Sequence, residues 1–469
     1  MSALPLTLHW VADAVAGWIV AGNPALTIGR VVTDTRTLQA GDCFVALRGA
    51  RFDAHEFVDE AIAKGVEAVL VEAGSAGRIF TASQNVGVIE VGDTTKALQD
   101  LAHAIRRASG TRVIAITGSA GKTTTKEAIA EFLAGAGRIV KNKGNLNNHI
   151  GLPLSLMQLR ERPDVAVMEL GMNHAGEIST LVAIAEPEVR VWTNAGDAHI
   201  GFFASADAIA DAKAEILEGA GPDHVLVANA DDARVIARVG SFAGRTVTFG
   251  TAAGATVRAT DIEDRGVEGM RARVTTPAGE RMVTTSLLGR GNLSNVLAAT
   301  AVALEFGVGL DDIAAAAARI APADRRGAVR RLRDGIVLID DSYNSSPAAL
   351  EKALDVVARD PTAKRKVAVV GEMLELGDRA TELHRASGRV AAQSGLGRLF
   401  AVGGPAAKAL ADAAIDAGMP AGSVEYIDRS ETAAARVATE LRAGDLVLVK
   451  GSRGTRTDLV ADRIAAEFA

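Results

Sequence analysis

The feature that most constrains the fold is one stretch of sequence, RVIAITGSAGKTTTKEAIAEF. The run RVIAIT is short, mostly apolar and β-branched and predicts a buried strand, whereas the end of the stretch has apolar residues at helical spacing. Between them stand Gly118 and Gly121, followed at once by Lys122 and Thr123. The order strand, loop, helix is the context that a phosphate-binding loop requires. The general pattern Gly-x-x-x-x-Gly-Lys-[Ser/Thr] would need a glycine where Ile116 stands, so a shorter loop of this kind is predicted.

Strand-like and helix-like runs alternate along most of the chain, which predicts an α/β fold with parallel sheets buried on both faces. At about 150 residues per domain, the chain of 469 residues is expected to form three domains. We place a small α/β domain at residues 1–105, a central ATPase-like domain with a parallel sheet at 106–322, and a Rossmann-like domain at 323–469. Residues 245–290 differ, because apolar and polar residues alternate there, and this pattern predicts antiparallel strands.

The composition excludes several classes of protein. The net charge of −6 argues against a general nucleic-acid binder, which needs a basic surface. No apolar run approaches the roughly 18 residues of a membrane span, and no cation precedes Arg30, so neither a membrane segment nor a secretory signal is expected. The single cysteine, Cys43, allows no intrachain disulfide and is predicted to be a buried apolar residue. We therefore expect a cytoplasmic protein.

Charged side chains follow the predicted strands of the central domain. Glu169 ends the apolar run DVAVME, where ligands bind in parallel sheets and where a carboxylate is costly without a cation. Asp197 and His199 follow the next strand, VRVWTN. These positions predict a magnesium site beside the phosphate loop. Lys213 lies on the helix that comes next, and the residues alone leave open whether it is a solvated lysine or a functional one.

Eight blocks of sequence occur in an order that resembles the Mur ligase family over essentially the whole chain. They are TGSAGKTTTKE, GNLNNHIGLPLSL, MELGMNHAGEI, TNAGDAHIGFF, AKAEIL, GRGNLSNVLAA, DDSYNSSPAAL and GEMLELG. The short phosphate loop is that family's own form. The resemblance implies an ATP-dependent amide ligase that joins D-alanyl-D-alanine to UDP-N-acetylmuramoyl-tripeptide through an acyl phosphate, in the synthesis of peptidoglycan precursors for the cell wall. It also implies a monomer.

Two other functions stay open at this point. The first is an amide ligase of the same superfamily that adds a single amino acid or glutamate, MurE-like or folylpolyglutamate synthase-like. The MurE-like motif Asp-Asn-Pro-Arg is absent from the chain. The second is an ATP-operated switch that binds a partner and forms no amide. The residues also leave open whether the third residue of the peptide substrate is diaminopimelate or lysine, and where in the third domain D-alanyl-D-alanine binds.

The resemblance assigns ATP-binding roles position by position. The phosphate loop, two amides near the adenine, one arginine and one ribose-binding carboxylate are implied: Gly118, Ser119, Ala120, Gly121, Lys122, Thr123, Thr124, Asn292, Asn295, Arg326 and Asp341. Two alternatives remain. Asn292 fits a helix N-cap equally well, and Arg325 competes with Arg326 as the phosphate contact, because the order of residues in DRRG departs from the family's more usual Gly-Arg.

Metal, catalytic and substrate roles are implied in the same way. Two Mg²⁺ ions are expected, with Thr123, Glu169 and His199 as ligands. Lys122, Glu169, His199 and Lys213 are expected to serve catalysis, with Lys213 at the position that several family members carbamylate. Three segments are expected to bind the substrate: DTRTLQAGDCFVALRG, which resembles the family's uridine-diphosphate segment, the Asn-rich block NKGNLNNHIGLP, and the loop DDSYN. The residues implied are Thr35, Arg36 and Arg48 in the first, Asn145, Asn148 and His149 in the second, and Tyr343 and Asn344 in the third. A surface cation at Arg36 and an Asn-rich turn are the alternative interpretations.

Overall fold

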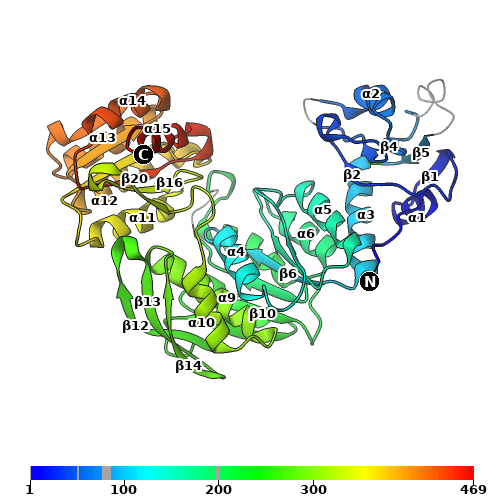
Figure 1. Cartoon of the computed structure of the whole chain (residues 1–469), viewed down its shortest axis with the longest axis horizontal. Coiled ribbons are helices and arrows are strands. Elements are labelled where there is room, and N and C mark those ends of the chain that lie inside the picture. The colour runs from blue at the N-terminus through cyan, green and yellow to red at the C-terminus, as the bar shows by residue number, and fades with distance from the viewer. Residues whose placement is uncertain (1, 50–51, 76–85, 197–199) are drawn as a thin grey trace.

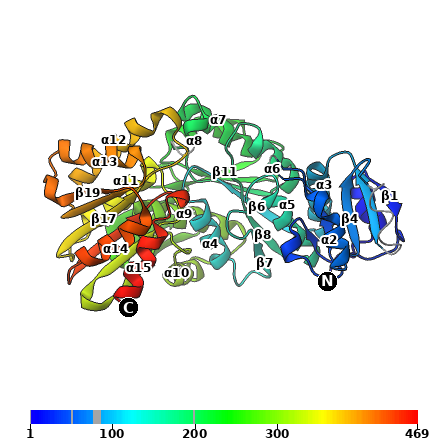
Figure 2. The same ribbon diagram turned by 90° about the horizontal axis from the view of Figure 1, so that it is seen from above.

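Three β-sheets follow one another along the chain (Figure 1). The computed structural model describes residues 2–49, 52–75, 86–196 and 200–469. The three units form an arch, with the first and third sheets at its ends and the central sheet between them (Figures 1 and 2). The predicted three-part α/β architecture is confirmed. Within the described segments, no helix combines the length and the apolar character that a membrane crossing needs.

The first sheet has five strands in the order β1-β5-β4-β3-β2. β1 is antiparallel to β5, and the other pairs are parallel. Cys43, at the start of β3, is fully buried as predicted, and burial raises the pKa of its thiol to about 12. The elements of this unit are α1 (Leu8–Ala14), β1 (Trp18–Ala21), β2 (Val31–Val32), β3 (Cys43–Val45), α2 (Val58–Ala63), β4 (Ala68–Glu72) and β5 (Gly87–Val91).

The central sheet has nine strands in the order β14-β13-β12-β11-β10-β9-β6-β8-β7. The strands from β7 to β12 in this order are parallel, and only β13 and β14 add antiparallel pairs. Its strands are β6 (Arg112–Thr117), β7 (Ile139–Lys141), β8 (Val165–Glu169), β9 (Val189–Trp192), β10 (Val225–Asn229), β11 (Arg245–Gly250), β12 (Val257–Asp264), β13 (Met270–Thr276) and β14 (Gly279–Thr285). Its helices are α4 (Lys122–Phe132), α5 (Gly151–Leu156), α6 (Glu177–Ala185), α7 (Ala206–Ala214), α8 (Ala233–Ile236), α9 (Gly289–Glu305) and α10 (Leu310–Arg319).

The pairing of β11 corrects the prediction of antiparallel strands throughout residues 245–290. β11 runs parallel to β10 and to β12, and only β12, β13 and β14 pair in the antiparallel sense. The alternation of apolar and polar residues in β11 reflects one buried face, which packs against α9. Such a pattern reports which face is covered and carries no information on strand direction.

The third sheet has six strands in the order β15-β16-β20-β17-β18-β19. β15 is antiparallel to β16, and the other pairs are parallel. Its strands are β15 (Ala328–Arg331), β16 (Val337–Asp341), β17 (Arg365–Gly371), β18 (Arg398–Val402), β19 (Val424–Ile427) and β20 (Asp445–Lys450). Its helices are α11 (Pro347–Arg359), α12 (Ala380–Gln393), α13 (Pro405–Asp416), α14 (Ser430–Glu440) and α15 (Asp458–Glu467).

Helix α3 (Thr94–Ser109) leads from the first sheet to the central one. It begins at the cap Asp93 and ends at Gly110, whose φ of 71° is the left-handed conformation that glycine adopts without strain. Near its end, the buried Arg106 donates hydrogen bonds to the carbonyl oxygen of Glu186 at 2.7 Å and to the carboxylate of Glu188 at 2.5 Å. This arginine therefore fastens α3 to the end of α6 in the central unit.

The central and third units meet through two short 3₁₀ turns, η5 (Ile200–Phe202) and η10 (Gly377–Arg379). The amide of Gly201 donates to the carbonyl oxygen of Glu375 at 3.1 Å. A Cβ placed on Gly201 would lie 2.6 Å from the nitrogen of Gly377, so the two backbones touch directly. Helices α9 and α11 add a second contact. These contacts hold the third unit against the loop that follows β9, at the carboxyl edge of the central sheet.

We predict that Arg106→Met destabilises the protein, because the substitution leaves the carboxylate of Glu188 and a helix-end carbonyl without their buried donor. A loss of about 3 kcal/mol is expected in the first unfolding transition, measured by denaturant titration. The matched control is Arg107→Met, since Arg107 is exposed and lies 3.7 Å from Glu186. That change should cost less than about 0.5 kcal/mol. Equal effects of the two substitutions would contradict the fastening role.

Candidate active site

The loop between β6 and α4 has a backbone that only glycine allows at two positions. Gly118 and Gly121 have φ values of 148° and 85°. A Cβ on Gly118 would lie 1.9 Å from the hydroxyl of Thr193, and one on Gly121 would lie 2.3 Å from the side-chain oxygen of Asn295. α4 begins at Lys122, directly after the loop, and the first amide groups of a helix have no acceptor within it. The structure thus has the open amides and positive helix end that bind phosphate.

The segment after β9 is joined to this loop by several hydrogen bonds. The side chain of Asn194 accepts from the amide of Ala120 and donates to its carbonyl oxygen, both at 2.9 Å, and the hydroxyl of Thr193 donates to the same carbonyl at 2.8 Å. Ser119 exchanges two hydrogen bonds of 2.9 Å with the backbone of Gly196. The sequence analysis assigned no role to Thr193 and Asn194. Because the amide of Ala120 is already bonded to Asn194, the amides left to meet phosphate are those of α4's first turn.

Glu169 lies at the centre of the site, as its place at the end of β8 predicted. Its side chain is almost fully buried. One carboxylate oxygen accepts from the hydroxyl of Thr123 at 2.8 Å, and the other accepts from the side-chain amide of Asn147 at 2.9 Å. Burial acts to raise the pKa of Glu169, but the nearby Lys122 and Lys126 outweigh it, and the net result is a lowered pKa. The carboxylate is therefore held in its charged form, ready for a cation.

Two further residues support Glu169, and the sequence analysis missed both. The side chain of Asn142 accepts from the backbone amide of Glu169 at 3.0 Å and donates to its carbonyl oxygen at 3.1 Å. Lys126 is buried on α4, donates to the carbonyl oxygen of Asn142 at 2.8 Å and lies 4.0 Å from the Glu169 carboxylate. A lysine on the inner face of a helix was the available signal, because burial of an ammonium group is costly unless it has partners.

Two lysines converge on the loop. Lys122 donates to the carbonyl oxygen of Gly118 at 2.8 Å. Lys213, on α7, is buried, so the interpretation of a solvated lysine is wrong. Burial first, and then the positive charge of Lys122, lower the pKa of Lys213 well below its ordinary value. Among the described residues none forms a hydrogen bond or an ion pair with its amino group. Both causes disfavour the charged form of this amine.

His199 and Asp197, predicted beside Glu169, lie outside the described residues, so their positions are not assigned. In the described ranges, with their gaps at 50–51, 76–85 and 197–199, no cluster of three or more His, Cys, Asp and Glu side chains could hold a metal ion.

The two predicted adenine-binding amides lie together on α9. The side chain of Asn295 donates to the side-chain oxygen of Asn292 at 3.0 Å, and Asn292 donates to the carbonyl oxygen of Leu288 at 2.9 Å. α9 begins at Gly289 and its N-cap is Leu288, so the alternative of an N-cap at Asn292 is wrong. Asn295 adjoins Gly121, which places this pair beside the phosphate loop.

An arginine of the third unit, Arg326, lies on the side that faces the phosphate loop. Arg326 stacks over the ring of Tyr343, with its guanidinium carbon 4.0 Å from the ring centre. Its charge adds to burial in lowering the pKa of Lys122, and it adds to Lys122 and Lys126 in lowering the pKa of Glu169. Arg325 points elsewhere and pairs with Asp462 at 2.9 Å. The geometry thus favours Arg326 over Arg325 as the residue that can reach a phosphate.

A lysine already binds the carboxylate of Asp341, which is predicted to bind the ribose. The buried amino group of Lys450, at the end of β20, donates to the carboxylate of Asp341 at 2.6 Å and to the carbonyl oxygen of Asn344 at 3.0 Å. Lys450 therefore fixes the loop that carries Asp341, Tyr343 and Asn344. The sequence analysis left Lys450 without a role.

The predicted uridine-diphosphate residues belong to the first unit, far along the arch from the phosphate loop (Figure 1). Arg36 is exposed and pairs with Asp34 at 2.6 Å, as a surface cation does. Arg48 pairs with Asp53 at 3.0 Å and with Glu72 at 2.7 Å. The carbonyl oxygen of Thr35 accepts a hydrogen bond from the amino group of Lys64 at 2.8 Å.

The Asn-rich block forms an exposed turn before α5. Asn145, Asn148 and His149 are all exposed, and the side chain of Asn148 accepts from the amide of Gly151 at 2.8 Å. The alternative of an Asn-rich turn therefore describes the local structure of Asn148. The half-buried Asn147, between these exposed residues, is the member of the block that reaches Glu169.

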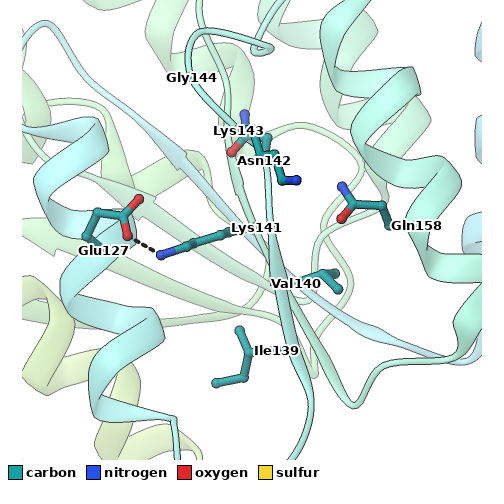
Figure 3. Close-up of a pocket in the computed structure, with 8 residues that line it drawn as sticks. All are labelled: Glu127, Ile139, Val140, Lys141, Asn142, Lys143, Gly144 and Gln158. Carbon is teal, nitrogen blue, oxygen red and sulfur yellow. Dashed lines mark hydrogen bonds and ion pairs between the residues drawn. The ribbon is translucent and has the colours of Figure 1, made fainter. Parts of the chain in front are cut away.

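A separate hollow of about 400 Å³ lies beside β7 at the edge of the central sheet (Figure 3). An ion pair between Lys141 and Glu127 crosses it, and Asn142 lines it from the side of the site. It contains none of the predicted phosphate-loop residues. The remaining lining residues are Ile139, Val140, Lys143, Gly144 and Gln158.

Comparison with known proteins agrees with this geometry. Three family models match in order: "Mur ligase family, catalytic domain" at residues 27–106, "Mur ligase middle domain" at 116–303 and "Mur ligase, glutamate ligase domain" at 325–453. The UDP-N-acetylmuramoyl-tripeptide–D-alanyl-D-alanine ligase of Bacillus subtilis is 34% identical over 98% of both chains. The chain belongs to the Mur ligase family.

Solved Mur ligases share its whole architecture. A crystal structure of MurF from Acinetobacter baumannii is 32% identical, covers 99% of this chain and 100% of its own, and has a TM-score of 0.88. The MurF ligase of Thermotoga maritima, solved in complex with ADP, is 30% identical, covers 93% of this chain and 97% of its own, and has a TM-score of 0.81.

We predict that Gly118→Ala abolishes tight nucleotide binding by this Mur ligase, because the new methyl group would collide with Thr193 and the backbone cannot relax at that φ. A loss of at least about tenfold in affinity for ADP with Mg²⁺ is expected by calorimetry. Gly135→Ala is the control. Gly135 follows α4 in the chain, and nothing lies within 4 Å of a Cβ placed on it. The prediction fails if both variants bind ADP as the unaltered protein does.

Proposed function

We propose that this Mur ligase joins D-alanyl-D-alanine to UDP-N-acetylmuramoyl-tripeptide at the expense of ATP. The observation that carries the proposal is the match to the Bacillus subtilis ligase of that name, which extends over 98% of both chains. The geometry supports it, because the phosphate loop, Glu169 and Arg326 gather at the junction between the central and third units. A ligase that brings together substrates held by separate units needs such a junction.

The residues present fit ATP and Mg²⁺. Gly118 and Gly121 give the loop the positive φ angles that place it directly before α4, and the hydroxyl of Thr123 and the carboxylate of Glu169 share a hydrogen bond of 2.8 Å. A hydroxyl and a carboxylate side by side are oxygen ligands of the kind that Mg²⁺ prefers. We assign Thr123 and Glu169 as magnesium ligands and His199 as a third. Bound Mg²⁺ would neutralise charge on the phosphates and the attacking carboxylate.

The reaction follows from the leaving-group problem of a free carboxylate. An oxygen of the tripeptide's terminal carboxylate attacks the γ-phosphorus of ATP, and the bond from that phosphorus to ADP breaks. The amine of D-alanyl-D-alanine, after losing a proton, then attacks the carbonyl carbon of the acyl phosphate. Inorganic phosphate departs with the oxygen that had joined it to the carbonyl, and the nitrogen loses a second proton as the amide forms.

This chain's residues act on that reaction by position and charge. Lys122 and Arg326 supply positive charge where negative groups must meet, which lowers the barrier electrostatically. Asn292 and Asn295 are assigned to the adenine, and Asp341 to the ribose. No nucleophilic side chain is needed, since the acyl group passes from phosphate to amine directly.

The other substrate contacts complete the proposal. We assign the uridine diphosphate to the first unit, through Thr35, Arg36 and Arg48. The tripeptide path then runs along Asn145, Asn148 and His149 toward Tyr343 and Asn344. We propose that the protein works as a monomer, as the family resemblance implies, and that it works in the cytoplasm, where ATP is plentiful.

A substrate panel tests the function. Phosphate release is measured with ATP, Mg²⁺ and UDP-N-acetylmuramoyl-tripeptide, with each amine in turn: D-alanyl-D-alanine, single amino acids and glutamate. Strict dependence on D-alanyl-D-alanine is expected. Turnover with only a single amino acid or with glutamate would instead identify a MurE-like or folylpolyglutamate synthase-like ligase. Binding of the nucleotide-sugar peptide without any turnover would also overturn the proposal. Tripeptides that carry diaminopimelate or lysine distinguish the third residue.

We further propose that Lys213 is carbamylated, which would supply an anion toward a second Mg²⁺. Only a neutral amine attacks carbon dioxide, and burial, with the charge of Lys122, lowers the pKa of Lys213 and so raises the neutral fraction of its amine. Carbon-13 NMR with labelled bicarbonate should show a carbamate signal that fades as the pH falls and the amine takes up a proton. Lys213→Met should remove the signal, and Lys64→Met, at an exposed lysine paired with Glu60, should keep it. A signal that survives Lys213→Met would refute the assignment.

A further inference from the structure

The linker between the central and third units contains one residue in an unfavourable conformation. Arg325 has a φ of 55°, in the left-handed region that residues with a side chain rarely adopt. Its neighbours are tied down: the amide of Arg326 donates to the carbonyl oxygen of Ala323 at 3.0 Å, and the amide of Gly327 donates to the carbonyl oxygen of Asp340 at 2.9 Å. A strained residue persists only where its surroundings hold it, so the contacts of Arg325 need explanation.

The guanidinium of Arg325 is anchored to α15. One of its nitrogens donates to both carboxylate oxygens of Asp462, at 3.1 and 2.9 Å, and another approaches the carbonyl oxygen of Asp458 at 3.4 Å. An arginine held by both oxygens of a carboxylate is fixed in direction as well as in place. The anchor lies in the third unit, whereas the linker leads back to the central unit.

The left-handed turn at Arg325 decides where the next side chain points. The carbonyl oxygen of Arg325 accepts from the amide of Tyr343 at 3.1 Å, and Arg326 lies over the Tyr343 ring at 4.0 Å. From there the charge of Arg326 is felt by Lys122 and Glu169 across the junction. A change of backbone conformation at Arg325 would carry Arg326 away from the phosphate loop.

A second carboxylate competes for Arg325. Asp340 is fully buried, and one of its oxygens lies 4.0 Å from Arg325 and 3.8 Å from Arg330. That oxygen accepts no hydrogen bond from any residue of the described chain. If Asp462 lost its charge, the guanidinium of Arg325 would be drawn toward this buried oxygen. The linker would then move with it.

We propose that Asp462 and Arg325 form a positioning pair, whose ion pair locks the linker in the turn that aims Arg326 at the bound nucleotide. The pair acts through Arg326, so its effect appears in nucleotide affinity and in turnover. The turnover readout rests on the proposed ligase function, whereas the affinity for ADP does not.

The test compares Asp462→Asn with a matched control, Asp416→Asn. Asp416 forms a carboxylate–arginine pair of 2.9 Å with Arg385 between α12 and α13 of the same unit. Asp462→Asn is expected to weaken ADP binding, measured by calorimetry with Mg²⁺, about tenfold through displacement of one phosphate contact. Asp416→Asn should bind within twofold of the unaltered protein. Equal affinities for the two variants, with equal unfolding temperatures, would overturn the proposal.

A double-mutant cycle separates positioning from a general loss of structure. In an Arg326→Met background the target of the positioning pair is gone, so Asp462→Asn should cost nothing further in ADP affinity. A tenfold loss that persists in this background would overturn the proposal. Asp462→Glu keeps the charge and should restore at least half of the lost binding free energy. If the unaltered protein binds ADP but makes no amide, the ligase function fails while the test of the pair still stands.

Discussion

The active site depends on one hydrogen bond, the 2.8 Å contact between the hydroxyl of Thr123 and the carboxylate of Glu169. It joins α4, which follows β6, to the end of the neighbouring strand β8, and so fixes the phosphate loop against the sheet. A carboxylate buried this deeply would normally take up a proton. Lys122 and Lys126, both on α4, keep it charged, and the side-chain amide of Asn147, from the turn before α5, donates to it.

The same region concentrates positive charge that its own carboxylates balance incompletely. The charge of Arg326 lowers the pKa of the buried Lys122, although burial is the larger cause and Glu169 acts in the opposite direction. Like charges crowded in a buried place are unfavourable in the folded chain itself. An anionic ligand relieves the repulsion, so part of the strain in the site is released when a polyphosphate binds. This is preorganisation by charge rather than by shape alone.

The sequence predicted those parts of the site whose signal is local. A glycine-rich loop between a strand and a helix, and an acidic residue at the end of an apolar run, identified Gly118, Gly121 and Glu169 without a structure. The three-part fold also followed from the alternation of strands and helices. Strand direction in β11 did not, since an alternating pattern records burial only. Nor did the burial of Lys213, because a lysine on a short helix has the same sequence signature whether its side chain faces solvent or the interior.

The supporting residues were missed for a different reason. Asn142, Asn194 and Lys450 act through hydrogen bonds to partners that are distant in the sequence. An asparagine in a loop has no feature that tells which backbone group it will meet. Such contacts depend on how strands from separate segments come side by side, and only the assembled sheets determine that.

The backbone contact between Gly201 and Gly377 has a mechanical consequence. Two glycines bring almost no apolar area to the surface they share, so parting them exposes little and costs little. A contact made by peptide backbone and one hydrogen bond, without interlocking side chains, should resist a small change in the angle between the two units only weakly. A methyl group on either glycine would clash with the facing backbone and would hold the two units apart.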